Sequence, residues 1–130
     1  MGITAEKQVY EAILLDEEAQ KIYGVSKIFQ GYAAPNSLAS LSEYLYITRV
    51  SDVSLDRNLD TPGDTLRRVR LQIDVCDVNY GRMVERSKII RRVLKQSFPS
   101  CIDGSTKGVV SSGDVVWNVT SIDIILFEED

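Results

Sequence analysis

The chain has 130 residues, no histidine, two cysteines and a formal net charge of −4. This length can bury a core as one domain, so a single domain is expected over residues 1–130. The missing histidines remove the usual general base and the commonest metal ligand, and two cysteines are too few for a disulfide framework. With no apolar run near the roughly 20 residues that span a bilayer, and no signal peptide, the sequence predicts a cytosolic protein without membrane, metal or cofactor.

The first third of the chain predicts two helices and a strand. Thr4 can cap a helix whose apolar residues recur at helical spacing: Ala5, Val9, Ala12 and Ile13. Asp16 then opens a second, shorter helix, and Gly24 is placed to end it. Residues 27–33 have the composition of a strand, and Pro35 begins a loop that runs to about residue 42.

Two further strands are predicted in the middle of the chain. Residues 43–55 alternate in the manner of a strand, and the polar stretch that follows contains Pro62 and Gly63, so a mobile connection is expected near residues 56–64. From Leu66 the apolar residues Val69, Leu71, Ile73 and Val75 share one face of a strand. The other face carries Arg68, Arg70, Gln72, Asp74 and Cys76, so this strand should have one face in water or against a partner.

The hydrophobic period becomes helical after Asn79, which is a good N-cap. One side of this helix carries Met83, Ser87, Ile90, Leu94 and Phe98, and Pro99 ends it. Residues 101–113 are rich in glycine and serine and predict a loop, with a short strand at Val109 and Val110. Within it, residues 103–108 lack the pattern of a phosphate-binding loop and predict a turn.

Residues 115–127 predict the last strand or strand pair. Ile122, Ile124 and Leu126 occupy one face, so Ile125 and Phe127 point the other way, which is unusual on a monomer and suggests contact with a partner. The order of elements is therefore helices, three strands, a helix and a strand. It predicts an α+β fold of two layers, with an antiparallel or mixed sheet of about four to five strands and helices packed on one face.

The sequence carries no convincing catalytic constellation. Cys76 stands between Asp74 and Asp77, but without a histidine to activate it, this cysteine is expected to be a packing or interface residue. The carboxylates lack a metal-ligand spacing. The chain is therefore predicted not to be an enzyme.

The long helix is strongly basic. Its cations are balanced within the helix only by Glu85, and they are Arg82, Arg86, Lys88, Arg91, Arg92 and Lys95. Such a helix could contact phosphates, with Arg82, Arg86 and Arg92 as the contacting residues. A solvent-facing or subunit-facing surface is the favoured interpretation, because no aromatic residues interleave with these charges.

Several stretches, taken in order, resemble one family: residues 14–35, 43–51, 67–94 and 116–129. They are similar to the bacteriophage tail-completion proteins, a family of small tail-terminator and head–tail joining proteins. The most recognisable stretch is residues 67–94, a strand followed by a tyrosine-containing turn and a long helix. The resemblance spans nearly the whole chain as a pattern of elements.

The resemblance implies a structural virion protein without catalysis. Such a protein forms a ring, commonly hexameric, that caps the tail tube, stops its polymerisation and meets the head connector. The implied partners are further copies of the chain, the tail tube protein and the head connector protein, while DNA passes through the lumen without specific binding. The implied location is the virion tail, assembled in the cytoplasm of a bacterial host.

Two groups of residues are expected to make these contacts. The subunit or partner interface is assigned to the outward faces of two strands: Arg68, Arg70, Gln72, Asp74, Ile125 and Phe127. The predicted loop is assigned a partner-contacting role through Asp56, Arg57, Asn58 and Asp60. The alternative function is a small nucleic-acid-binding accessory protein that uses the basic helix over residues 82–95.

Overall fold

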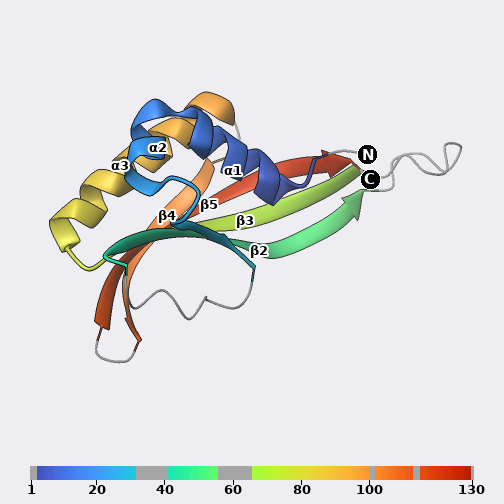
Figure 1. The fold of residues 1–130 in the computed structure, drawn as a ribbon. Coiled ribbons are helices and arrows are strands. Elements are labelled where there is room, and N and C mark those ends of the chain that lie inside the picture. The colour runs from blue at the N-terminus through green and yellow to red at the C-terminus, as the bar shows by residue number, and fades with distance from the viewer. Residues whose placement is uncertain (1–2, 32–40, 56–65, 100–101, 113–114, 130) are drawn as a thin grey trace, which may run out of the picture.

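The computed structural model describes residues 3–31, 41–55, 66–99, 102–112 and 115–129. Three helices pack on one face of a five-stranded mixed sheet, so the predicted two-layer α+β class is confirmed (Figure 1). The elements are α1 (Ala5–Leu15), α2 (Glu17–Tyr23), β1 (Ile28–Gln30), β2 (Glu43–Leu55), β3 (Leu66–Asp77), α3 (Tyr80–Ser97), β4 (Ile102–Ser112) and β5 (Val115–Glu129).

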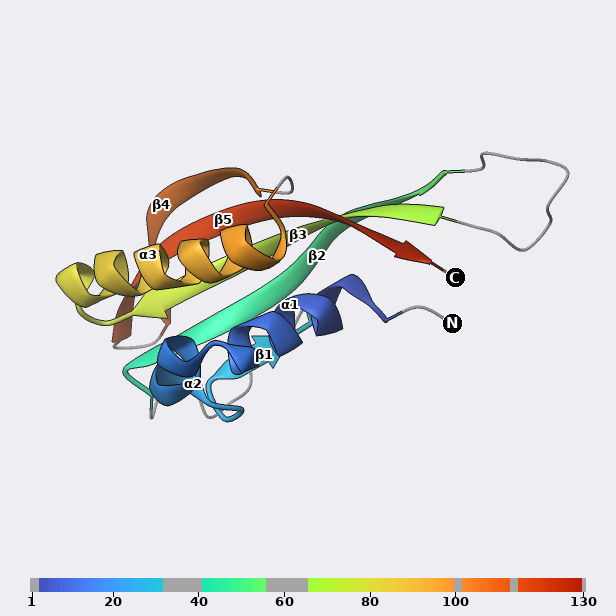
Figure 2. The ribbon, with the colours of Figure 1, turned by 90° about the horizontal axis from the view of Figure 1, so that it is seen from above.

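The strands are arranged in the order β1-β2-β3-β5-β4. The short β1 is parallel to β2, and the other neighbouring pairs are antiparallel. Long β2, β3 and β5 extend past the helices at one end, as Figure 2 shows. A shift in the β2–β3 register between Arg49 and Ser51 inserts one residue. This bulge aligns Arg49 with buried Leu71 and Ser51 with outward Arg70, so the strand stays in the sheet while its alternation resets.

The helices begin where the sequence places their caps. The Thr4 hydroxyl accepts a hydrogen bond from the Lys7 amide at 3.3 Å, and Asp16 accepts one from the Ala19 amide at 3.0 Å. Asn79 accepts from the Arg82 amide at 2.8 Å. Each cap satisfies an amide that the first turn of a helix leaves without a partner. The predicted starts of all three helices are confirmed.

The core lies between the helices and the sheet. The sheet contributes fully buried residues from its central strands, including Leu45, Ile47, Leu71, Ile73, Ile122 and Ile124. The helices contribute Val9, Ile13, Ile90 and Leu94, which are also fully buried. Alternation along the strands and helical spacing along the helices therefore converge on one apolar layer.

The prediction of a loop over residues 101–113 was wrong, and so was the turn over residues 103–108, although the short strand predicted at Val109 and Val110 is confirmed as part of a longer one. β4 forms an edge strand that pairs antiparallel with β5 from Ile102 to Ser112. Its glycines, serines and threonine give no hydrophobic alternation, so the strand is held by backbone hydrogen bonds to β5 rather than by its own propensity. The predicted order of elements consequently lacked one strand.

Two other predicted boundaries also change. The first strand is short, Ile28–Gln30, although residues 27–33 predicted more; residues 32 and 33 lie outside the described part. The last segment, predicted over residues 115–127 as a strand or a strand pair, is one continuous strand, β5, that reaches Glu129.

Among the helices of the described ranges, none is long and apolar enough to cross a membrane.

Candidate functional site

The face of the sheet turned away from the helices carries most of the predicted interface. We call it the helix-free face and define it by Arg68, Arg70, Gln72 and Asp74 of β3. The alternate β3 residues Val69, Leu71, Ile73 and Val75 are fully buried beneath the helices. The prediction that β3 has one apolar and one polar face is confirmed from Arg68 to Asp74, but Cys76, which was also placed on the polar face, is buried in an apolar cluster.

A polar network holds the centre of the helix-free face. The Ser121 hydroxyl and the Gln72 amide both donate to Asp74 Oδ1, at 2.6 and 2.9 Å. Arg70 Nη2 lies 2.8 Å from Asp123 Oδ2. The Ser121–Asp74 and Arg70–Asp123 bonds cross from β3 to β5, where the register places Asp74 opposite Ser121. The structure thus brings predicted residues of β3 together with polar residues of β5, and holds their side chains in place before any partner binds.

The end of the helix-free face beyond the helices is apolar. Register pairs Val53 with Arg68 and Arg68 with Phe127, and the neighbouring row contains Ile125. Val53 and Phe127 are 47% and 49% exposed, and Ile125 is half-buried. Arg68 is exposed and has no ion pair within the described ranges. We call Val53, Arg68, Ile125 and Phe127 the distal patch; exposed apolar side chains that gather in this way commonly mark a contact surface.

A charged network near the start of α1 was not foreseen from the sequence. The Arg49 guanidinium lies 2.6 Å from Glu6, 2.7 Å from Glu128 and 3.1 Å from Asp52. Glu128 also accepts a 2.7 Å hydrogen bond from the Ala5 amide. The bonds to Arg49 lower the pKa of Glu128, and the bond to Glu6, more than any other contact, raises the pKa of Arg49. The network ties α1, β2 and β5 together beside the distal patch.

The arginines of α3 are engaged within the chain. Arg82 Nε lies 2.8 Å from Asp77 Oδ2, and Arg86 Nε lies 3.3 Å from Glu43 Oε2. Asp77 is fully buried and Glu43 nearly so. The hydrogen bond to Asp77 raises the pKa of Arg82. Comparing the cations and acidic residues within α3 alone missed these carboxylates, because Asp77 and Glu43 belong to other elements.

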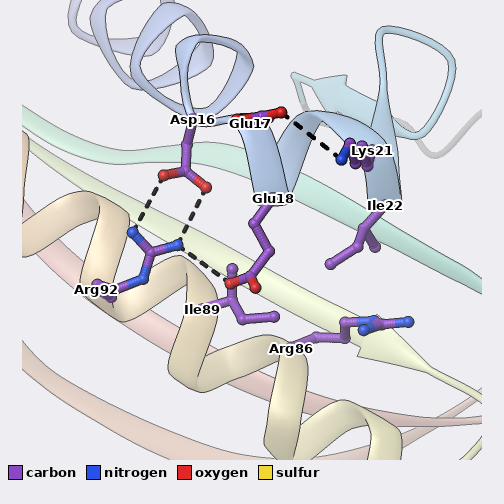
Figure 3. A pocket seen from close by; sticks show the side chains of 8 residues that line it. All are labelled: Asp16, Glu17, Glu18, Lys21, Ile22, Arg86, Ile89 and Arg92. Atoms are coloured by element: carbon purple, nitrogen blue, oxygen red, sulfur yellow. Dashed lines mark hydrogen bonds and ion pairs between the residues drawn. The ribbon is translucent and has the colours of Figure 1, made fainter.

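Arg92 is held in a groove between α2 and α3. The groove is lined by Asp16, Glu17, Glu18, Lys21, Ile22, Arg86, Ile89 and Arg92. In Figure 3 the guanidinium of Arg92 reaches both oxygens of Asp16, at 3.1 Å each, and Glu18 at 3.2 Å. The bonds to Arg92 lower the pKa of Asp16. All three arginines proposed for phosphate contact therefore already have carboxylate partners in this chain.

Cys76 belongs to a second, smaller apolar cluster. It packs with Tyr44, Trp117 and Val119, and it is 3% exposed. The rings of Tyr44 and Trp117 meet edge to face, with centroids 4.9 Å apart. Burial raises the pKa of the Cys76 thiol to about 12. Such a thiol is protonated at neutral pH, in agreement with the packing role expected for it.

Some predictions lie outside the described ranges. They concern the loop residues Asp56, Arg57, Asn58 and Asp60, which were predicted to contact a partner; Cys101, expected to be a free thiol, also lies outside these ranges. Across the residues that the structure does describe, no group of three or more potential ligands is arranged to hold a metal ion.

Comparison with known proteins adds a fold relation. No family model matches the sequence, and no curated protein matches it. Among solved structures, the chain is similar to one in a structure described as "Virion of native gene transfer agent (GTA) particle", with a TM-score of 0.53 and 8% sequence identity. The alignment covers 97% of this chain and 95% of the other. The two chains therefore share a whole domain fold rather than a local motif.

Proposed function

We propose that this chain is a structural subunit of a phage-like virion. It forms a homo-oligomeric ring, hexameric by the family resemblance, at the head-proximal end of a tail, where it ends polymerisation of the tail tube and joins tail to head. The observation that carries the proposal is the fold likeness, over nearly the whole of both chains, to a chain of a gene transfer agent virion. The independent resemblance of the strand and helix over residues 67–94 to tail-completion proteins supports the finer assignment.

The surface chemistry supports assembly rather than catalysis. The distal patch exposes apolar side chains beside Arg68, which has no ion pair within the described ranges, and the polar network around Asp74 gives the same face fixed hydrogen-bonding groups. This mixture of apolar and ordered polar groups is typical of protein–protein interfaces. The thiol of Cys76 is buried and protonated, so it is a poor nucleophile. In this proposal the tail tube protein and the head connector are the partners, in a tail assembled in the bacterial cytoplasm.

The proposal also accounts for DNA passing through the ring without specific binding. The net charge is −4, and the arginines of α3 are paired with Asp77, Glu43 and Asp16. Neutralised cations release few counterions when they meet phosphates, so they add little affinity.

Native mass spectrometry over a range of protein concentrations, with and without DNA, tests this function. A discrete ring-sized oligomer that forms without DNA is expected. Arg68→Glu should weaken it, because the charge reversal alters the distal patch without breaking an ion pair of the described fold. Arg70→Glu should act similarly but also disrupts the bond to Asp123. The matched control is Lys88→Glu on exposed α3; unchanged assembly of an Arg68→Glu, Arg70→Glu double variant would refute the assigned interface.

The alternative function is a nucleic-acid-binding accessory protein, and the same experiment separates it. A monomer that shifts only when DNA is added, with retention that weakens steeply as salt rises, would favour this alternative. Neutralising Arg86 and Arg92 should then abolish retention. Because these arginines also bind carboxylates of this chain, a Lys88→Gln, Lys95→Gln variant on the exposed side of α3 serves as a second probe.

A further inference from the structure

A ring of more than two copies, built by one repeated contact, needs two different surfaces on each copy. A single self-complementary patch closes a dimer instead. The distal patch supplies one surface. The inference below rests on the proposed ring and identifies the surface that receives the distal patch.

A second exposed apolar patch lies where β4 and β5 meet the start of α3. Val109 and Val116 are 66% and 53% exposed, and Val78 and Tyr80 are 42% and 58% exposed. We call these four residues the hairpin patch. None of them was singled out from the sequence as an interface residue.

Strand register places the members of the hairpin patch together. Val109 pairs with Asn118, and Val116 pairs with Ser111, so Val109 and Val116 are diagonal neighbours on one face. The Asn118 amide contacts the carbonyl oxygens of Asp77 and Val78, each at 3.4 Å. These contacts bring the corner between β3 and α3, with Val78 and Tyr80, beside the β4–β5 hairpin.

The two patches lie at opposite ends of the sheet. Val116 and Phe127 are near the two ends of β5, as Figure 1 shows for the strand. At the usual rise of a strand, the eleven steps between them span roughly 35 Å. The distal patch of one copy therefore cannot reach its own hairpin patch, and a contact between the two must join different copies.

The two patches also lie on opposite faces of the sheet. Along β5, Val116 has the same parity as buried Ile122 and Ile124, so it lies on the helix side. Phe127 has the opposite parity and lies on the helix-free face. Two copies that face the same way, related by a shift along the strands and a rotation, can thus overlap with the distal patch of one over the hairpin patch of the next, and the rotation allows the series to close into a ring. Dimerisation through one patch alone would require the second copy to be turned over.

We propose that the distal patch of one copy lies against the hairpin patch of the next copy, and that this head-to-tail contact closes the ring. The charges agree with the pairing. Arg68 in the distal patch and Glu85, in the second turn of α3 after Tyr80, are both exposed, and neither has an ion pair within the described ranges. The occupant of the hairpin patch is therefore a second copy of this chain.

A mixing experiment tests the pairing. Phe127→Asp alters the distal patch, and Val109→Asp alters the hairpin patch; both positions are about half or more exposed, so each monomer should fold. Val116→Asp is a second hairpin variant, and Val25→Asp, which replaces a 69% exposed valine outside both patches, is the control. Each patch variant alone should be monomeric by native mass spectrometry, and the control should assemble like the wild type.

The 1:1 mixture of the two patch variants carries the decisive result. Each mixed pair retains one intact distal patch and one intact hairpin patch, so a heterodimer and nothing larger should form. A mixture that stays monomeric, or a hairpin variant that assembles like the wild type, would overturn the pairing while leaving the ring itself intact. A wild-type protein that is monomeric at every concentration would overturn the proposed ring and the pairing together.

Discussion

Replacing Arg49 with methionine should destabilise the fold more than removing an exposed surface cation does. The Arg49 side chain is only 20% exposed, and it contacts Glu6 and Glu128, which are 22% and 11% exposed. Without the guanidinium, carboxylates largely removed from water lose their cation. Breaking a fully buried pair costs about 3–5 kcal/mol, and the partial exposure here lowers the expected loss to about 2–3 kcal/mol. For a domain of this size that corresponds to a fall in Tm of roughly 8 °C.

The loss of stability in Arg49→Met should be large at neutral pH and smaller in acid. The bonds to Arg49 lower the pKa of Glu128 below its ordinary value, so the pair stabilises the fold fully above that value. As the pH falls through the lowered, folded-state pKa, Glu128 takes up a proton and the stabilisation is lost. The difference between wild type and Arg49→Met should therefore be largest at pH 7 and should shrink below pH 4.

Urea unfolding followed by the fluorescence of buried Trp117 measures both effects. It should be run at a protein concentration where the wild type is monomeric, because assembly adds its own stability. Lys7→Met is the matched control, since Lys7 is an exposed cation on α1, next to Glu6 in the sequence. An Arg49→Met variant as stable as this control at pH 7, or a deficit that does not shrink in acid, would refute the reasoning.

Three further predictions concern single positions. The buried thiol of Cys76, whose pKa is raised to about 12, should resist iodoacetamide at pH 8 until the protein is denatured. Peptide mass spectrometry measures the labelling, and modification of Cys76 in the native protein would contradict the prediction. Gly24 ends α2 at φ 55° and ψ −166°, so Gly24→Ala should cost about 1–3 kcal/mol in urea unfolding, and an unchanged midpoint would be the contrary result. Asn79→Ala should cost about 1 kcal/mol by removing the cap of α3, while Asn79→Ser should retain most of the stability.

Local patterns in the sequence predict much of this fold because they act through neighbouring residues. The alternation of β3, the helical stripe of α3 and the caps at Thr4, Asp16 and Asn79 all depend on residues at most a few positions apart. The prediction of an outward Phe127 is likewise confirmed by its exposure. Most of β4 was missed for the same reason: apart from Val109 and Val110, its residues carry no local signal, and a strand 11 residues long forms only because β5 lies beside it.

The candidate surfaces, too, could be predicted from the sequence only in part. Alternation along β3 and β5 is sufficient to place Arg68 and Phe127 on the helix-free face. It is not sufficient to place Val53 in the same row, because the bulge after Arg49 changes which residues of β2 share that face. The hairpin patch depends on β4, so it cannot be found as long as residues 101–113 are predicted to be a loop.

The sequence by itself determined the class of fold, the two-faced central strand and the positions where helices begin, because hydrophobic period and capping are properties of short segments. Only the tertiary structure decided which charged side chains have partners of opposite charge. Arg82, Arg86 and Arg92 look like a basic helix along the chain, yet their partners come from β3, β2 and the α1–α2 junction. Electrostatic pairing depends on distance in space, and contacts between Arg92 and Asp16, 76 positions apart, have no signature in the local sequence.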